Sequence, residues 1–176
     1  MTFSRRILNV RLPLKTYALV VALGIGGLPA WAAETSLAQT AERTPVNLRT
    51  IVFVCEHGSV KSIVAAAHFN RIARERGLPF IAVSRGINVD DKIPGSIRDG
   101  LARDGLAPTD ETPRDLRVEE ATDAAHVIAF DQVPAARGGQ AAVTYWKDVP
   151  PVTKDYDAAR AVIVKHIETI AGDLAK

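Results

Sequence analysis

The residues best suited to chemistry lie in one short segment, residues 54–62 (VCEHGSVKS), which contains the only cysteine of the chain, Cys55. Consecutive backbone N–H groups in a tight loop can form a concave anion site, and Gly58 can adopt the positive φ that such a loop needs. A helix that starts after the loop would add partial positive charge at the same place. Both effects favour the thiolate of Cys55, so the segment predicts a nucleophilic sulfur beside an oxyanion site, and thiolate attack on phosphate.

Three other interpretations of this segment can be weighed from its residues. Composition alone favours a buried structural cysteine at a strand end, because buried cysteine is common. The pair Lys61-Ser62 is similar to the end of a nucleotide-binding P-loop, but no glycine precedes Lys61 or stands at the required upstream position, which excludes that motif. Cys55 and His57 have no further ligands at usable spacing, so we expect neither a metal nor a cofactor.

The surrounding sequence predicts strands that alternate with helices. Continuous apolar runs indicate buried strands at residues 50–54, 80–84, 126–130 and 142–146. Helices are expected at residues 61–76, closed by Gly77, and at 94–104, 117–124 and 155–175. On the last helix, a 4-3-4-4 spacing predicts a buried stripe of Ala159, Ile163, His166, Ile170 and Leu174. The alternation is typical of a parallel α/β sheet, whose ligands lie at the C-terminal strand ends, where Cys55 falls.

The order Cys55, five residues, Lys61 and Ser62, directly after the first strand, resembles the low-molecular-weight protein-tyrosine-phosphatase family, which also includes arsenate reductases. That family carries Cys, five residues, Arg and Ser or Thr at this place. The resemblance extends over residues 48–176, through the segments Ser84-Arg85-Gly86, 98–105 with Pro113-Arg114, 128–131 and 146–150. It implies an α/β three-layer sandwich, with a four-stranded parallel sheet flanked by helices.

The resemblance also implies a role for each matching position. Cys55 would be the nucleophile that forms a cysteinyl phosphate, Lys61 the cation on the phosphate oxygens, and Ser62 the hydroxyl that donates to the thiolate. Asp148 would be the general acid, and Asp131 is its rival, although a structural role at its strand end is the stronger expectation for Asp131. The loop positions that would bind phosphate are Glu56, His57, Gly58, Ser59, Val60 and Lys61.

Two departures from the family pattern affect the expected activity. Lysine offers one point charge where arginine offers a planar fork, and the loss of bidentate contacts could cost on the order of 2–4 kcal/mol in the transition state. Asp148 is followed by Val149-Pro150-Pro151 rather than by the aromatic residues that wall a phosphotyrosine slot. We therefore expect phosphomonoester hydrolysis without phosphotyrosine specificity.

The alternatives are a non-catalytic oxyanion-binding protein and an arsenate reductase that uses an external thiol. A reductase that passes its arsenic through an internal disulfide needs further cysteines, and Cys55 has no such partner. The expected partner is accordingly a small-molecule or protein phosphomonoester, or another oxyanion, and we expect the protein to be a monomer.

The N-terminal residues have the pattern of an export signal. A basic segment with Arg5, Arg6, Arg11 and Lys15 precedes an uncharged run, residues 16–33. Near its end this run contains the small-residue pattern Ala30-Trp31-Ala32, and the whole order is typical of a cleaved signal peptide. Glycine and proline interrupt a run barely long enough to span a bilayer, so residues 1–32 are interpreted as a signal peptide and residues 33–47 as a flexible leader. The domain, residues 48–176, is then periplasmic or secreted without stable membrane insertion, by the general or the twin-arginine route. An unpaired cysteine in an exported protein also needs a functional explanation.

The charge distribution excludes nucleic acid as the expected partner. The 176-residue chain has 22 basic and 20 acidic residues, but four of the basic residues lie in the first 32 positions. The remaining chain therefore carries a net charge of −2, which gives no electrostatic support for binding a phosphate backbone.

Overall fold

The computed structural model of the chain describes residues 47–176. The predicted signal peptide and all of the predicted leader except Asn47 lie outside the described residues. Within residues 47–176, no helix combines the length and the apolar character needed to cross a membrane.

Four parallel strands form one sheet in the order β2-β1-β3-β4. The strands are β1 (Arg49–Cys55), β2 (Phe80–Gly86), β3 (His126–Ala129) and β4 (Val143–Tyr145). The inner strand β1 pairs with β2 along its whole length, from Arg49↔Phe80 to Cys55↔Gly86. Residues 51–54 of β1 are fully buried because helices cover both faces of the sheet.

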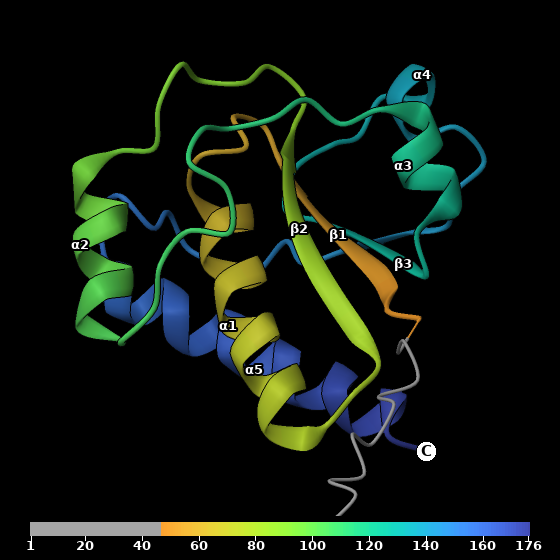
Figure 1. Cartoon of the computed structure of the whole chain (residues 1–176). Coiled ribbons are helices and arrows are strands. Elements are labelled where there is room, and N and C mark those ends of the chain that lie inside the picture. The colour runs from red at the N-terminus through yellow and green to blue at the C-terminus, as the bar shows by residue number, and fades with distance from the viewer. Residues whose placement is uncertain (1–46) are drawn as a thin grey trace, which may run out of the picture. The chain divides into compact units, whose positions relative to one another are not determined.

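Helices lie on both sides of this sheet, which gives three layers (Figure 1). The helices are α1 (Lys61–Arg76), α2 (Gly95–Arg103), α3 (Val118–Asp123), α4 (Ala135–Gly138) and α5 (Tyr156–Leu174). Alternate residues of β1 enter two separate cores: Ile51, Phe53 and Cys55 belong to the core with α1, α2 and α5, and Val52 and Val54 to the core with α3. The α/β sandwich with a four-stranded parallel sheet is thereby confirmed.

Small residues let α1 lie close against the sheet. Ala65 and Ala66 are fully buried in the first core, together with Phe69 one turn further along the helix. The helix ends at Gly77, which has φ 64° and whose N–H donates to the carbonyls of Ala73 and Arg74. The N-terminus of α1 is thus fixed at the C-terminal end of β1, directly after the Cys55 loop.

One prediction about the helices needs correction, and one helix was missed. The buried stripe of α5 consists of Ala159, Ile163, Ile167 and Ala171, with a regular spacing of four. His166, Ile170 and Leu174 are only partly buried, because the helix turns a slightly different face to α1 than the larger residues suggested. The four-residue helix α4 was not predicted, since one turn is too short to show a helical period.

Candidate active site

The Cys55 loop turns its carbonyl groups outward and its N–H groups inward. The carbonyl of Glu56 accepts hydrogen bonds from the N–H groups of residues 87 and 88, both at 2.9 Å, and that of His57 accepts from residue 90 at 3.2 Å. The carbonyl oxygen of Gly58 lies 3.2 Å from Ser84 Oγ. In residues 47–176, the N–H groups of residues 57–62 donate to no protein acceptor. This arrangement is an anion-binding nest at the start of a helix.

Two glycines allow the loop to pass over the end of β2. Gly58 has φ 63°, and a Cβ atom built on it would lie 2.8 Å from the backbone nitrogen of Gly86. A Cβ atom on Gly86 would lie 2.7 Å from the nitrogen of Gly58. Only hydrogen at both positions permits this backbone contact, which gives the loop its curvature.

A chain of hydroxyl groups leads to the sulfur of Cys55, which is 4% exposed. Ser84 Oγ donates to Ser62 Oγ at 2.8 Å, and Ser62 Oγ lies 3.0 Å from Cys55 Sγ. A thiolate can only accept a hydrogen bond, so with ionised Cys55 the hydrogen of Ser62 Oγ is directed to the sulfur and Ser62 accepts from Ser84 Oγ. That hydrogen bond and the N-terminus of α1 both stabilise negative charge on the sulfur.

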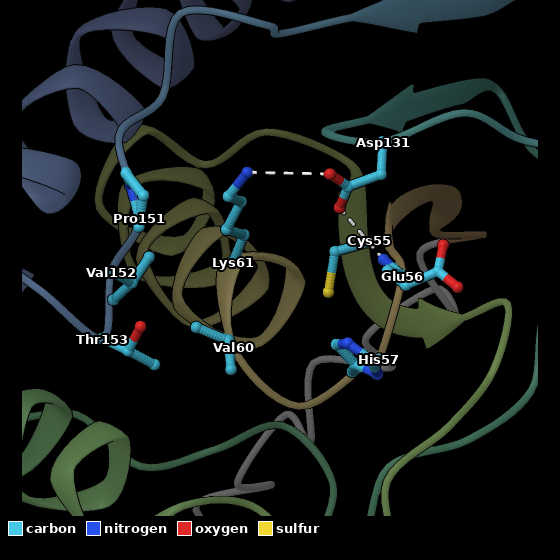
Figure 2. Close-up of a pocket in the computed structure, with 9 residues that line it drawn as sticks. All are labelled: Cys55, Glu56, His57, Val60, Lys61, Asp131, Pro151, Val152 and Thr153. Carbon is cyan, nitrogen blue, oxygen red and sulfur yellow. Dashed lines mark hydrogen bonds and ion pairs between the residues drawn. The ribbon is translucent and has the colours of Figure 1, made fainter.

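Lys61 and Asp131 form the opposite side of the site (Figure 2). Asp131 Oδ2 accepts a hydrogen bond from the N–H of Glu56 at 3.0 Å. Its other oxygen lies 3.8 Å from Lys61 Nζ, which also sits 6.0 Å from the centre of the Phe130 ring. Asp131 therefore fixes the start of the loop and draws the lysine toward the end of β3.

A pocket of about 270 Å³ opens over Cys55. The loop supplies its floor and one side, and residues 151–153, before α5, supply the facing wall (Figure 2). Its lining residues are Cys55, Glu56, His57, Val60, Lys61, Asp131, Pro151, Val152 and Thr153. The lining residues are aliphatic and polar, and the pocket has space for a phosphoryl group and a small attached group.

Asp148 lies outside this lining, so the structure does not bring it together with Cys55. Both of its carboxylate oxygens are 2.9 Å from His166 Nε2 on α5, and its side chain is 63% exposed. The hydrogen bond from His166 holds the pKa of Asp148 below its usual value. The His166 ring in turn stacks on Trp146, with ring centres 4.7 Å apart.

Sequence reasoning missed the residues that hold the loop from the side of β2. Asp90 accepts a hydrogen bond from Ser59 Oγ at 2.5 Å, and its Oδ1 lies 3.5 Å from His57 Nδ1. The segment Ser84-Arg85-Gly86 carried a signal, because a strand end facing the Cys55 loop must supply partners to it. No signal in the sequence pointed to Asp90, because the residues it contacts, Ser59 and His57, lie 31 and 33 positions before it in the chain.

The structure thus combines a parallel α/β sandwich with an N–H-lined loop that has a cysteine at its base. The family model of low molecular weight phosphotyrosine protein phosphatases matches residues 50–166. The chain belongs to this family. No curated protein sequence matches it significantly.

Solved structures show the same architecture. The chain is similar to YfkJ from Bacillus subtilis, with 20% sequence identity and a TM-score of 0.64 over 73% of this chain and 95% of that one. It is similar to a mutant of the arginine phosphatase YwlE with a phosphorylated active-site serine, at 22% identity and a TM-score of 0.65, over 72% and 96% of the two chains. An arsenate reductase from Archaeoglobus fulgidus is 26% identical, with a TM-score of 0.56 over 69% and 98%. The family supports a phosphatase or arsenate-reductase-like function with a phosphoester or another oxyanion as partner.

Proposed function

We propose that the protein hydrolyses phosphomonoesters through a cysteinyl-phosphate intermediate on Cys55. The observation that carries this proposal is the Ser84–Ser62–Cys55 hydrogen-bond chain at the base of the N–H-lined loop. A buried cysteine with a purely structural role needs neither a hydroxyl donor nor a nest of free N–H groups around it. Both features stabilise a sulfur anion next to a bound oxyanion.

The reaction follows from these positions. The non-bridging phosphate oxygens accept hydrogen bonds from the N–H groups of residues 57–62, and Lys61 turns from Asp131 to the phosphate. The Cys55 thiolate attacks phosphorus, a new S–P bond forms, and the bond from phosphorus to the leaving oxygen breaks. Water then attacks phosphorus, inorganic phosphate leaves, and the thiolate is restored.

Lys61 sets the expected speed of this reaction. One ammonium group contacts the equatorial oxygens less completely than a guanidinium fork does, and Asp131, 3.8 Å away, competes for its charge. We therefore expect slow turnover. The pocket walls Val60, Pro151 and Val152 favour no particular leaving group by stacking, so phosphotyrosine is not assigned as the substrate.

The direct test is hydrolysis of 4-nitrophenyl phosphate by the purified protein and by its Cys55→Ser variant. Phosphate release that disappears with Cys55→Ser supports the proposal. Release that persists in Cys55→Ser refutes it, because the sulfur would then have no covalent role. Far-UV circular dichroism of both proteins serves as the folding control.

A second candidate is an oxyanion-binding protein without useful catalysis. It is favoured by the Lys61–Asp131 contact and by Asp148, which binds His166 rather than facing the pocket. Calorimetry of the Cys55→Ser protein with phosphate, sulfate and arsenate tests it, and the absence of binding would remove it. Arsenate reduction with an external thiol is a third candidate, which fails if glutathione and arsenate yield no arsenite.

We also propose that the protein is exported and acts outside the cytoplasm. The proposal rests on the basic residues, the uncharged run and the Ala30-Trp31-Ala32 pattern of the N-terminal sequence. Mature protein recovered outside the cytoplasm should begin at Ala33. Protein that keeps residues 1–32 and stays in the cytoplasm would contradict this assignment.

A further inference from the structure

His57 is a titratable side chain of the pocket that neither contacts the sulfur through a hydrogen bond nor holds Lys61. It stands two residues after Cys55 in the loop and lines the same pocket, with 57% of its side chain exposed. In Figure 2 its ring lies beside Cys55, on the side away from Lys61 and Asp131. A substrate whose phosphoryl group sits on the loop would therefore have its remaining part within reach of this ring.

The contacts of His57 assign its ring nitrogens. Nδ1 lies 3.3 Å from the carbonyl oxygen of Asn88 and 3.5 Å from Asp90 Oδ1. A carbonyl can only accept, and so can an ionised carboxylate, so Nδ1 carries a hydrogen. Nε2 is then the nitrogen that gains and loses the second proton, which is the arrangement of a histidine oriented by a carboxylate.

Asp90 is itself held in place. Ser59 Oγ, which is fully buried, donates to Asp90 Oδ2 at 2.5 Å, and the N–H of Asp90 donates to the carbonyl of His57 at 3.2 Å. Asp90 is thus tied to the loop at two points besides the imidazole, one through its carboxylate and one through its backbone N–H.

The neighbouring carboxylates have other partners. Glu56 Oε1 accepts a hydrogen bond from Asn88 Nδ2, and its carboxylate points away from the pocket in Figure 2. Asp131 uses one oxygen for the N–H of Glu56 and faces Lys61 with the other. Asp148 binds His166 outside the pocket.

We propose that His57 is the general acid of the reaction and that Asp90 is its positioning residue; this inference rests on the proposed function. As the thiolate forms the S–P bond, the imidazolium gives its Nε2 proton to the leaving oxygen, and the alcohol departs neutral. The neutral imidazole then takes a proton from the water that attacks phosphorus. This second transfer restores the imidazolium, while the broken S–P bond restores the Cys55 thiolate.

The role predicts a dependence on the leaving group. An alkoxide is a poor leaving group and needs the proton, whereas 4-nitrophenolate is stable without it. Loss of a general acid therefore slows alkyl phosphates much more than activated aryl phosphates. A loop that had merely lost its shape would bind and process both classes equally badly.

The experiment compares the wild-type protein with His57→Asn and His57→Gln on 4-nitrophenyl phosphate and β-glycerol phosphate. An asparagine amide can keep the donor to the carbonyl of Asn88 but has no group at the position of Nε2. We expect His57→Asn to lower kcat/KM for β-glycerol phosphate by about 100-fold or more, the usual contribution of a general acid, and for 4-nitrophenyl phosphate by less than about tenfold. His57→Gln should behave in the same way, since an amide cannot give up a proton.

Asp90→Asn provides a second measurement. It should lower kcat/KM for β-glycerol phosphate by a larger factor than kcat/KM for 4-nitrophenyl phosphate, because the imidazole loses the carboxylate that orients its ring. Glu56 and Lys61 are the other charged side chains of the loop and are unchanged in this variant.

Three results would overturn the role of His57. Equal losses on both substrates would reduce it to a structural residue, and unchanged activity on both would exclude it. Wild-type protein that shows no Cys55-dependent turnover on either substrate would refute the proposed function, and the general acid with it. The first two results leave Cys55-dependent hydrolysis intact, so the two failures are distinguishable.

Discussion

Replacing Gly58 with alanine tests whether the close contact between the Cys55 loop and β2 builds the anion site. Gly58 has φ +63°, and its Cβ atom would meet three backbone atoms: the nitrogen of Gly86 at 2.8 Å, its Cα at 3.0 Å and the carbonyl carbon of Arg85 at 3.2 Å. Backbone atoms of a paired strand cannot swing aside as the end of a long side chain can. The loop must therefore move away from the end of β2.

The expected loss of stability follows from two contributions. A non-glycine residue in the left-handed region costs about 1–2 kcal/mol. Overpacking against fixed neighbours adds about 1–3 kcal/mol. We expect Gly58→Ala to lower the free energy of unfolding by about 2–5 kcal/mol.

Gly77 supplies the matched control. It has nearly the same φ, +64°, but a Cβ atom there has no neighbour within 4 Å. Gly77→Ala should therefore cost only the backbone contribution, about 1–2 kcal/mol. The difference between the two variants isolates the contact between Gly58 and Gly86.

Urea unfolding followed by far-UV circular dichroism measures both losses, and calorimetry with inorganic phosphate measures the site. Phosphate binding should be lost in Gly58→Ala, since the N–H groups no longer converge, and kept in Gly77→Ala. Equal losses of stability, together with unchanged phosphate binding in Gly58→Ala, would refute the reasoning.

Three further predictions concern other parts of the molecule. Lys61→Arg should raise kcat/KM for 4-nitrophenyl phosphate about 30-fold or more, because the fork restores bidentate contacts; unchanged kinetics would show that the lysine is not limiting. Asp148→Asn should destabilise the protein at about pH 5.5 but not at about pH 2, as measured by urea unfolding. His166 holds the folded pKa of Asp148 below its usual 3.8, so the stabilisation is present above that value and is lost as the pH falls through the folded pKa; a loss that is the same at both pH values would contradict the pairing. Tyr156→Phe removes the hydroxyl that donates to Asp104 Oδ2 at 2.7 Å and should cost about 1–2 kcal/mol in urea unfolding, and no change would exclude that hydrogen bond as a stabilising contact.

The fold could be predicted from the sequence because a strand that is buried on both faces of a sheet has a distinctive sequence, with apolar residues at consecutive positions. A run such as TIVFV in β1 has no polar face and can lie only inside a covered sheet. Helix α1 was predicted with the bounds it has, Lys61–Arg76, because Gly77 marks its end clearly. The stripe of α5 was misassigned because large residues were weighted above Ala171, whose small side chain is what close packing against α1 requires.

The site was predictable where its parts are close in sequence or stand at the ends of neighbouring parallel strands. Cys55 and Ser62 are brought together by one loop and one helical turn, so their contact follows from local structure. Asp148 depends on the path of the chain between β4 and α5, and the stacking of His166 on Trp146 directs it to the helix. The contacts of Asp90 depend on how two loops meet at the sheet edge, which the pattern of residues does not encode locally.

The central claim is that phosphate becomes covalently attached to Cys55. It is tested most directly by acid quenching of the protein during turnover of 4-nitrophenyl phosphate, followed by mass spectrometry of its peptides, with Cys55→Ser as the control. We predict one phosphoryl group on the peptide that contains Cys55, carried by the sulfur, during wild-type turnover. Continuing product release with Cys55 unmodified, or a phosphoryl group on another residue, would contradict the account.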